Sequence, residues 1–127
     1  MINSNGKSIV VVDDERDIVN QIKRSLGDMD GFKVCAFIDP FAALEHFSSC
    51  CKDHQIVISD IRMPGMNGYE FVKRVKKIDP QVKIILMSSC EINDNELLDV
   101  LPAVNIDTFL QKPFSLDILT NIMKIPS

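Results

Sequence analysis

Five short apolar runs, separated by segments with helical spacing, constrain the fold of this chain more than any other feature. The runs lie at 8–12, 32–37, 55–59, 82–87 and 106–110. Each is apolar along most of its length, as strands covered on both faces are. In the segments between them, apolar residues recur every three or four positions, which favours helices. The alternation predicts an α/β domain with a doubly wound, five-stranded parallel sheet and right-handed crossovers.

Capping residues mark where several of these helices begin and end. Asp39 and Pro40 supply an N-cap and a first-turn proline. Asn67 is followed three residues later by Glu70, a variant of the capping box, and Asp79 and Pro80 end that helix. Predicted helices cover 15–27, 67–78 and 94–101, and two others begin at Pro40 and after Ser115.

Size, charge and cysteine usage narrow the class of protein. The chain has 127 residues, which fits one domain over 1–127 with a core at about 7–124 and no output domain. A net charge of −4 argues against direct nucleic-acid binding. No apolar run approaches the roughly 20 residues that span a bilayer, and the N-terminus lacks a signal-peptide core. The four cysteines form no C-x-x-C pair. These features predict a cytoplasmic protein that does not bind membranes.

Polar residues follow four of the five predicted strands. Asp13 and Asp14 follow the first, Asp60 the third, Ser88 the fourth and Lys112 the fifth. Carboxyl ends of parallel strands share one edge of the sheet, where ligands bind. Crowded carboxylates raise one another's pKa values, and a divalent cation such as Mg²⁺ relieves that repulsion. Carboxylates, a metal, a lysine and a hydroxyl together are what phosphoryl transfer to a carboxylate requires.

Four motifs at these strand ends, "VVDDE", "ISDIRMPGMNG", "LMSS" and "FLQKPF", resemble the receiver domain of bacterial-type two-component response regulators. The resemblance extends from about Lys7 to about Met123. It implies a flavodoxin-like (βα)5 fold with strand order 2-1-3-4-5.

The resemblance also implies a role for each acid at the strand ends, for one backbone carbonyl and for the lysine. Asp60 corresponds to the phosphoacceptor and Asp14 to a direct magnesium ligand. Asp13 corresponds to a ligand that acts largely through water, and the backbone carbonyl of Arg62 to a further ligand. Lys112 corresponds to the lysine that contacts the phosphoryl group. The implied cofactor is Mg²⁺, with Mn²⁺ as an alternative that Asp60, Asp13 and Asp14 would also bind.

The same resemblance implies switch and structural positions. Ser88 corresponds to the switch hydroxyl and Phe109 to the aromatic switch residue. The peptide bond before Pro113 corresponds to a cis bond, which only proline makes cheap. Gly68 is expected to allow a backbone conformation that other residues resist.

The implied function is that of a phosphoacceptor in a phosphorelay. The donor would be a histidine kinase or a histidine phosphotransfer protein. Phosphorylation would shift a two-state equilibrium that controls an output domain or a homodimer formed through the fourth helix, fifth strand and fifth helix. Such a domain is not an enzyme beyond its own phosphorylation and dephosphorylation.

Other interpretations of the same residues remain at this stage. Asp13 and Asp14 alone also suit the N-terminus of a helix, and Phe109 also suits a plain core position. A metal-dependent phosphatase with an aspartyl intermediate usually has its nucleophile after the first strand, whereas here the lone acid, Asp60, follows the third. A nucleotide-binding domain would have glycines where "DDERD" stands. A pseudo-receiver that binds partners without phosphorylation would not need the acids and the lysine.

Overall fold

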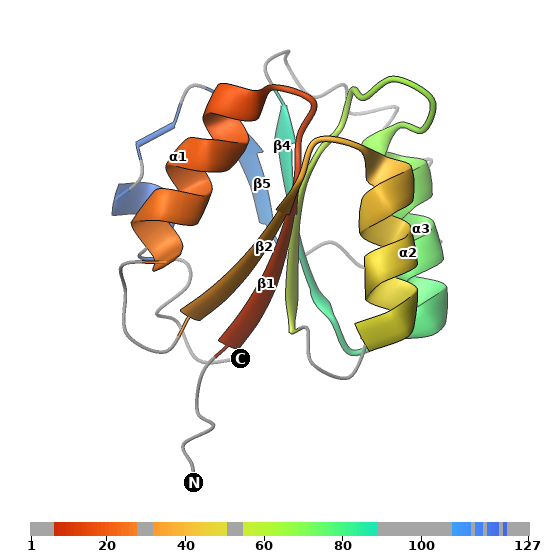
Figure 1. The fold of residues 1–127 in the computed structure, drawn as a ribbon. Helices are drawn as coiled ribbons and strands as arrows, with labels where there is room; N and C mark the ends of the chain where they lie inside the picture. The colour runs from red at the N-terminus through yellow and green to blue at the C-terminus, as the bar shows by residue number, and fades with distance from the viewer. Residues whose placement is uncertain are drawn as a thin grey trace, which may run out of the picture.

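The computed structural model describes residues 7–27, 32–50, 55–88, 108–112, 114–115, 117–119 and 121. Its strands form one parallel sheet in the order β2-β1-β3-β4-β5 (Figure 1). The strands are β1 Lys7–Val12, β2 Phe32–Phe37, β3 Ile56–Asp60, β4 Lys83–Ser88 and β5 Thr108–Gln111. The predicted fold class and strand order are therefore confirmed.

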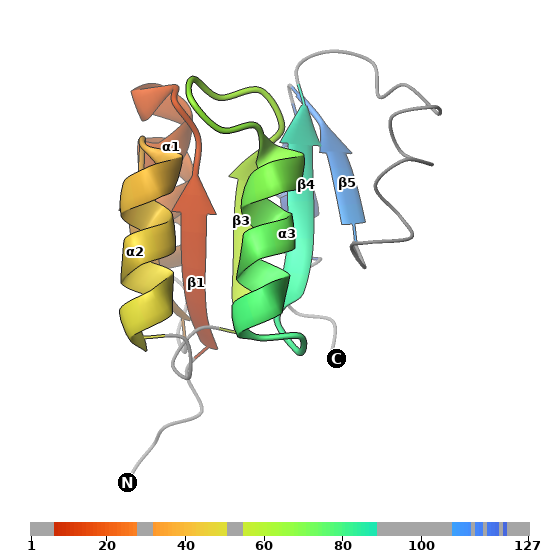
Figure 2. The same cartoon turned by 90° about the vertical axis from the view of Figure 1, so that its right-hand side faces the viewer.

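Three helices cover the two faces of this sheet. They are α1 Arg16–Gly27, α2 Pro40–Cys50 and α3 Gly68–Ile78. Figure 1 shows α1 on one face, and Figures 1 and 2 show α2 and α3 side by side on the other. Residues 117–119 and 121 are also helical, and the Ser115 hydroxyl accepts a hydrogen bond from Ile118 N–H at 3.2 Å, as a cap does. The predicted helix at 94–101 lies outside the described residues.

The helix termini follow the capping chemistry that the sequence indicates. Asn67 Oδ1 accepts a hydrogen bond from Glu70 N–H at 2.9 Å, and Asp39 Oδ1 accepts one from Phe41 N–H at 3.1 Å. Asp79 is the C-cap of α3, with its N–H donating to the Val75 carbonyl at 2.9 Å. Each cap fixes where its helix begins or ends and therefore where the adjoining loop runs.

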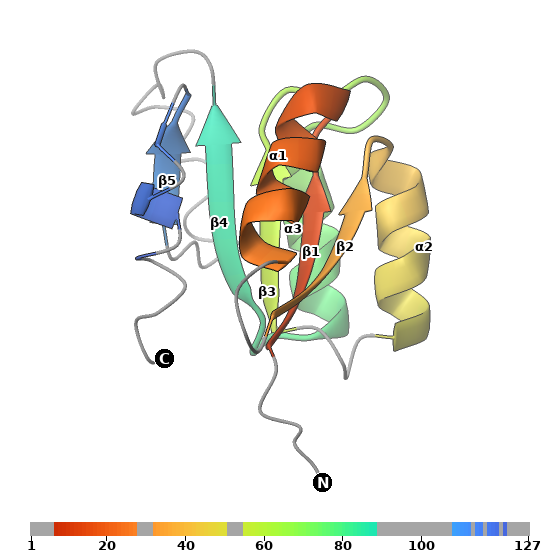
Figure 3. The ribbon, with the colours of Figure 1, turned by 60° about the vertical axis from the view of Figure 1, so that its left-hand side comes forward.

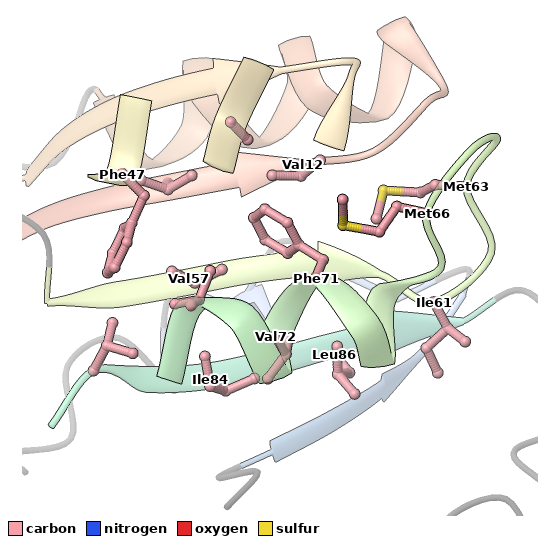
Figure 4. Close-up of a cluster of buried hydrophobic side chains, with 14 residues drawn as sticks. Val12, Phe47, Val57, Ile61, Met63, Met66, Phe71, Val72, Ile84 and Leu86 are labelled. Atoms are coloured by element: carbon pink, nitrogen blue, oxygen red, sulfur yellow. The ribbon is translucent and has the colours of Figure 1, made fainter. Parts of the chain in front are cut away.

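Alternation along the strands divides the core into two layers. Val10, Val57 and Leu86 face α2 and α3, where they pack with Phe47 and Phe71 (Figure 4). The opposite layer packs beneath α1 and around Leu119, and its strand residues are Ile9, Val11, Ile56, Ile58, Ile85, Met87 and Leu110. Because both faces of the sheet are covered, its strands are apolar along most of their length. Burial of these side chains holds the strand ends in fixed positions relative to one another.

Two strands run one residue further than the sequence indicates. β3 ends at Asp60 and β4 ends at Ser88, so both residues are the last of their strands rather than the first of a loop. The strands point the same way, and their carboxyl ends meet at one edge (Figure 3). The polar residues of the site lie at that edge.

Among the described helices, none is long and apolar enough to cross a membrane.

Candidate functional site

The acids predicted to converge lie together at the carboxyl edge of the sheet. In the parallel register Val12 pairs with Ser59, so the residues that follow, Asp13 and Asp60, leave neighbouring strands side by side. Carboxylate oxygens of Asp13, Asp14 and Asp60 all lie within 4.8 Å of one another. Asp13 and Asp60 are buried, whereas Asp14 is exposed. The cluster therefore has a buried floor and one carboxylate open to solvent.

Lys112 brings a positive charge into this cluster. Its Nζ lies 2.5 Å from Asp13 Oδ2, 3.4 Å from Asp60 Oδ1 and 3.4 Å from Glu15 Oε1. The backbone fixes its position, because Lys112 N–H donates a hydrogen bond to the Ser88 carbonyl at 2.7 Å. The lysine is itself buried, so its ammonium depends on these carboxylates for compensation of its charge.

Burial and charge crowding shift the pKa values of the three buried groups. Burial, and next the charge of Asp13, raise the pKa of Asp60 from 3.8 to about 6, although Lys112 opposes the rise. Burial also raises the pKa of Asp13, against its hydrogen bonds from Lys112 and from Glu15 N–H. Burial alone would lower the pKa of Lys112, but the hydrogen bond and charge of Asp13, with the charges of Asp60 and Glu15, outweigh burial and raise that pKa. One lysine thus only partly neutralises the acids around it.

The donor set suits a metal ion. Two carboxylates from the loop after β1, Asp13 and Asp14, and one from the end of β3, Asp60, place oxygens within 4.8 Å of one another. Hard divalent cations prefer oxygen ligands of this kind, and a cation would relieve the repulsion that raises the pKa of Asp60. The chemistry of the cluster therefore fits an acidic metal-binding site.

Ser59 and Gly68 hold the backbone of Asp60 in place. The Ser59 hydroxyl donates a hydrogen bond to the Asp60 carbonyl at 2.9 Å. Gly68, the first residue of α3, packs directly against the same carbonyl, because a Cβ added there would lie 2.3 Å from the Asp60 oxygen and 2.8 Å from Ile61 Cα. The expectation of an unusual backbone conformation at Gly68 is wrong, because among the described glycines a positive φ occurs only at Gly65. Gly68 is needed for space, not for torsional freedom.

The loop of residues 61–67 connects Asp60 to α3. Ile61 N–H donates to the Met87 carbonyl at 2.9 Å, and Gly68 N–H donates to the Ile61 carbonyl at 2.6 Å, so the loop is closed at its base. The side chains of Met63 and Met66 are buried against the α2–α3 layer (Figure 4). The Arg62 side chain is exposed. The assignment of the Arg62 carbonyl as a metal ligand stays a prediction.

The predicted switch residues lie near the acids. Ser88 is buried at the end of β4, beside β3 and Asp60. Phe109 is half-buried and packs against the α2–α3 layer, next to Leu86 in the register of β4 and β5. Their switch roles stay predictions. Pro113 lies outside the described residues, and so does its predicted cis bond.

Glu15 belongs to this site although the sequence did not single it out. Its N–H donates to Asp13 Oδ1 at 2.9 Å, and its carboxylate is one of the three that surround the Lys112 ammonium. Its place in the "DDE" run two residues after Asp13 was the available signal. The side chain is largely exposed and helps to compensate the charge of Lys112 from the solvent side.

A parallel sheet of this order with acids and a lysine at its carboxyl edge defines a receiver-type signalling domain. The chain belongs to the response regulator receiver domain family, whose model matches residues 9–124. It is similar to the C4-dicarboxylate transport transcriptional regulatory protein DctD of Rhizobium meliloti, with 31% identity over 87% of this chain and 23% of DctD. It is also similar to the response regulator SaeR of Staphylococcus epidermidis, with 31% identity over 84% of this chain and 44% of SaeR. The chain therefore spans less than half the length of these two relatives.

Solved structures give the same family. A response regulator receiver domain protein from Clostridium thermocellum matches with a TM-score of 0.80 and 29% identity, over 91% of this chain and 89% of that one. The chemotaxis protein CheY4 of Vibrio cholerae matches with a TM-score of 0.81 and 26% identity, over 94% and 97%. The BeF3-activated DrrB receiver domain matches with a TM-score of 0.77 and 26% identity, over 94% and 95%. The flavodoxin-like receiver fold and membership of two-component signalling are thus confirmed.

Proposed function

We propose that this chain accepts a phosphoryl group on Asp60 from a phosphohistidine of a histidine kinase or histidine phosphotransfer protein. The observation that carries the proposal is the contact set around Asp60. Its buried carboxylate lies 3.4 Å from the Lys112 ammonium and within 4.8 Å of two further carboxylates. A nucleophile, a fixed cation and a metal-type donor set at one point are the components of phosphoryl transfer to a carboxylate.

In the transfer, a carboxylate oxygen of Asp60 attacks the phosphorus of the donor. A new O–P bond forms while the P–N bond of the phosphohistidine breaks. The electron pair of that bond goes to the imidazole nitrogen, which takes up a proton. The product is an acyl phosphate on Asp60. Because Asp60 is the last residue of a central strand, its carboxylate is held rigidly at the open edge of the sheet.

Asp13 and Asp14 would hold Mg²⁺ together with Asp60 and the Arg62 carbonyl. When bound, this metal supplies positive charge that offsets the negative charge of the phosphoryl oxygens. Asp14 is exposed, which suits direct coordination, whereas Asp13 already accepts hydrogen bonds from Lys112 and Glu15 N–H, which suits a contact through water.

Lys112 and Ser88 serve the phosphoryl group itself. The Lys112 ammonium, which Asp13 holds in place, approaches Asp60 from the β5 side of the site and contacts a phosphoryl oxygen there. The Ser88 hydroxyl at the end of β4 donates a hydrogen bond to another oxygen. The Phe109 ring beside β4 then follows the movement of Ser88, which couples Asp60 to the surface that partners bind.

We further propose that the domain works in the cytoplasm and catalyses only its own phosphorylation and dephosphorylation. Its partners are the phosphodonor and either an output domain or a second copy of the chain. The presence of receiver sequences within the longer regulators DctD and SaeR supports control of an output domain.

The deciding experiment is incubation with acetyl phosphate, followed by intact-mass measurement. With Mg²⁺ present, the wild-type chain is expected to gain the mass of one phosphoryl group. The gain should disappear when EDTA removes the metal and return when excess Mg²⁺ is added. A chain that gains no phosphoryl group in Mg²⁺, or that gains it equally in EDTA, contradicts the proposal.

A further inference from the structure

The tip of the 61–67 loop, residues 64 and 65, rests against an aromatic ring that the phosphorelay function does not explain. Phe41 lies in the first turn of α2 and is 51% exposed, although it is one of the larger apolar residues of the described chain. A Cβ added at Gly65 would meet its ring at 3.0 Å from Cε2, 3.8 Å from Cζ and 3.9 Å from Cδ2. The ring edge therefore packs closely against Gly65, and a side chain at this position would have to push the ring back by a few tenths of an ångström.

The position of this ring is fixed from below. Asp39 Oδ1 accepts the Phe41 N–H at 3.1 Å, and the Asp39 carbonyl accepts the Ala43 N–H at 3.1 Å, so the first turn of α2 is capped. Ala43 and Phe47, further along the same helix, are fully buried in the layer shared with α3. Phe41 thus projects from a rigid helix end, whereas the residues it covers belong to an irregular loop.

The loop needs such support at its tip. Its base is held by the Ile61 and Gly68 hydrogen bonds, and Met63 and Met66 anchor it to the core. Pro64 and Gly65, between the two methionines, are exposed. Gly65 has a φ of 85°, in the left-handed region that favours glycine. A glycine has the greatest backbone freedom of any residue, so an unsupported tip here would sample several conformations.

We propose that Phe41 is a positioning residue for the metal site, acting through Gly65 on the loop that carries the Arg62 carbonyl. Arg62 lies between Asp60 and the supported tip, so the orientation of its carbonyl depends on where the tip lies. This role rests on the proposed function, since it concerns the same metal site. It explains why a large apolar ring is kept half in solvent, where its burial alone stabilises little.

Two measurements on Phe41→Ala separate this role from a structural one. The first is hydrogen exchange of the amides of residues 61–67 without metal, where the variant should exchange about threefold faster or more, because the tip opens more often. The second is a Mg²⁺ titration, where the dissociation constant should rise about three- to tenfold. This rise is smaller than the one expected when a group that hydrogen-bonds directly to a metal ligand is removed. Phe41→Leu should keep most of the wild-type protection from exchange and most of the wild-type Mg²⁺ affinity. Ile118→Ala, a truncation at a comparably exposed residue, should change neither.

A double-mutant cycle tests the contact itself. Gly65→Ala places a Cβ against the ring and also strains a positive φ, so it should weaken Mg²⁺ binding. In the Phe41→Ala background only the backbone strain remains, so Gly65→Ala should weaken Mg²⁺ binding less there than in the wild-type background. Equal effects in both backgrounds, or wild-type loop exchange and Mg²⁺ affinity in Phe41→Ala, overturn the inference. A wild-type chain that binds no Mg²⁺ would instead contradict the proposed function, while faster exchange in Phe41→Ala would still show the contact.

Discussion

Replacing Asp60 by asparagine is expected to stabilise the metal-free protein. The pKa of Asp60 rises from 3.8 to about 6 on folding, because burial and the charge of Asp13 disfavour the ionised form. The folded state therefore binds this proton more tightly than the unfolded chain. Consequently the ionised carboxylate destabilises the fold fully above about pH 6, and progressively less as the pH falls toward about 4.

The magnitude follows from the size of this shift. At about 1.4 kcal/mol for each pKa unit, a rise from 3.8 to about 6 corresponds to about 3 kcal/mol at about pH 8. Near pH 5 the wild-type carboxyl is mostly protonated in the folded state and mostly ionised in the unfolded state. About 1.5 kcal/mol of the destabilisation by the Asp60 carboxyl therefore remains at this pH. Asparagine has nearly the same shape and no charge. Asp60→Asn should therefore be more stable by about 3 kcal/mol at the higher pH and by about half as much at the lower.

Urea denaturation in EDTA, at about pH 8 and about pH 5, measures both values. Glu45→Gln is the matched control, because Glu45 is an exposed acid on α2, and its stability should equal that of the wild type at both pH values. Adding Mg²⁺ should narrow the gap at the higher pH, because the metal binds only the folded wild type tightly. The reasoning is refuted if Asp60→Asn gains no stability, or gains the same amount at both pH values.

Three further substitutions test other parts of the site. Asp14→Ala should weaken Mg²⁺ binding about tenfold or more in a titration, since it removes the exposed carboxylate proposed as a direct ligand; unchanged affinity would exclude this role. Lys112→Met should lower stability by about 3 kcal/mol in urea denaturation at about pH 8, because Asp13 stays buried without its cation; a neutral effect would mean that Asp13 relaxes into solvent. Gly68→Ala should lower the free energy of unfolding by about 1–3 kcal/mol, because its Cβ meets the Asp60 backbone 2.3 Å away; wild-type stability would show that α3 moves aside freely.

The fold could be predicted from the sequence because the strands are apolar along most of their length and capping residues mark the ends of α2 and α3. The Asn67 side chain marked the start of α3 by accepting a hydrogen bond from Glu70 N–H, and Pro80, after the C-cap Asp79, marked its end. The convergence of Asp13, Asp14 and Asp60 followed from the topology alone, since parallel strands bring their carboxyl ends to one edge. Residues nearly 50 positions apart could thus be placed in one site without any coordinates.

Contacts that depend on side-chain conformation or on close packing could not be predicted in this way. The sequence predicted that Lys112 lies in the site. It did not predict that the Lys112 ammonium lies closer to Asp13 than to Asp60. The need for glycine at position 68 comes from a helix start that touches the strand backbone, which no local pattern records. The Phe41–Gly65 contact joins the first turn of α2 to the 61–67 loop, which lies far from it in the sequence, so only the packed structure shows it.

The most direct test of the account is where the phosphoryl group goes. Wild-type protein and Asp60→Asn are incubated with acetyl phosphate and Mg²⁺ under the same conditions, and their intact masses are compared. One phosphoryl group is expected on the wild type and none on the variant, which keeps the fold and is at least as stable as the wild type. A phosphoryl group on folded Asp60→Asn would contradict the assignment of Asp60 as the phosphoacceptor.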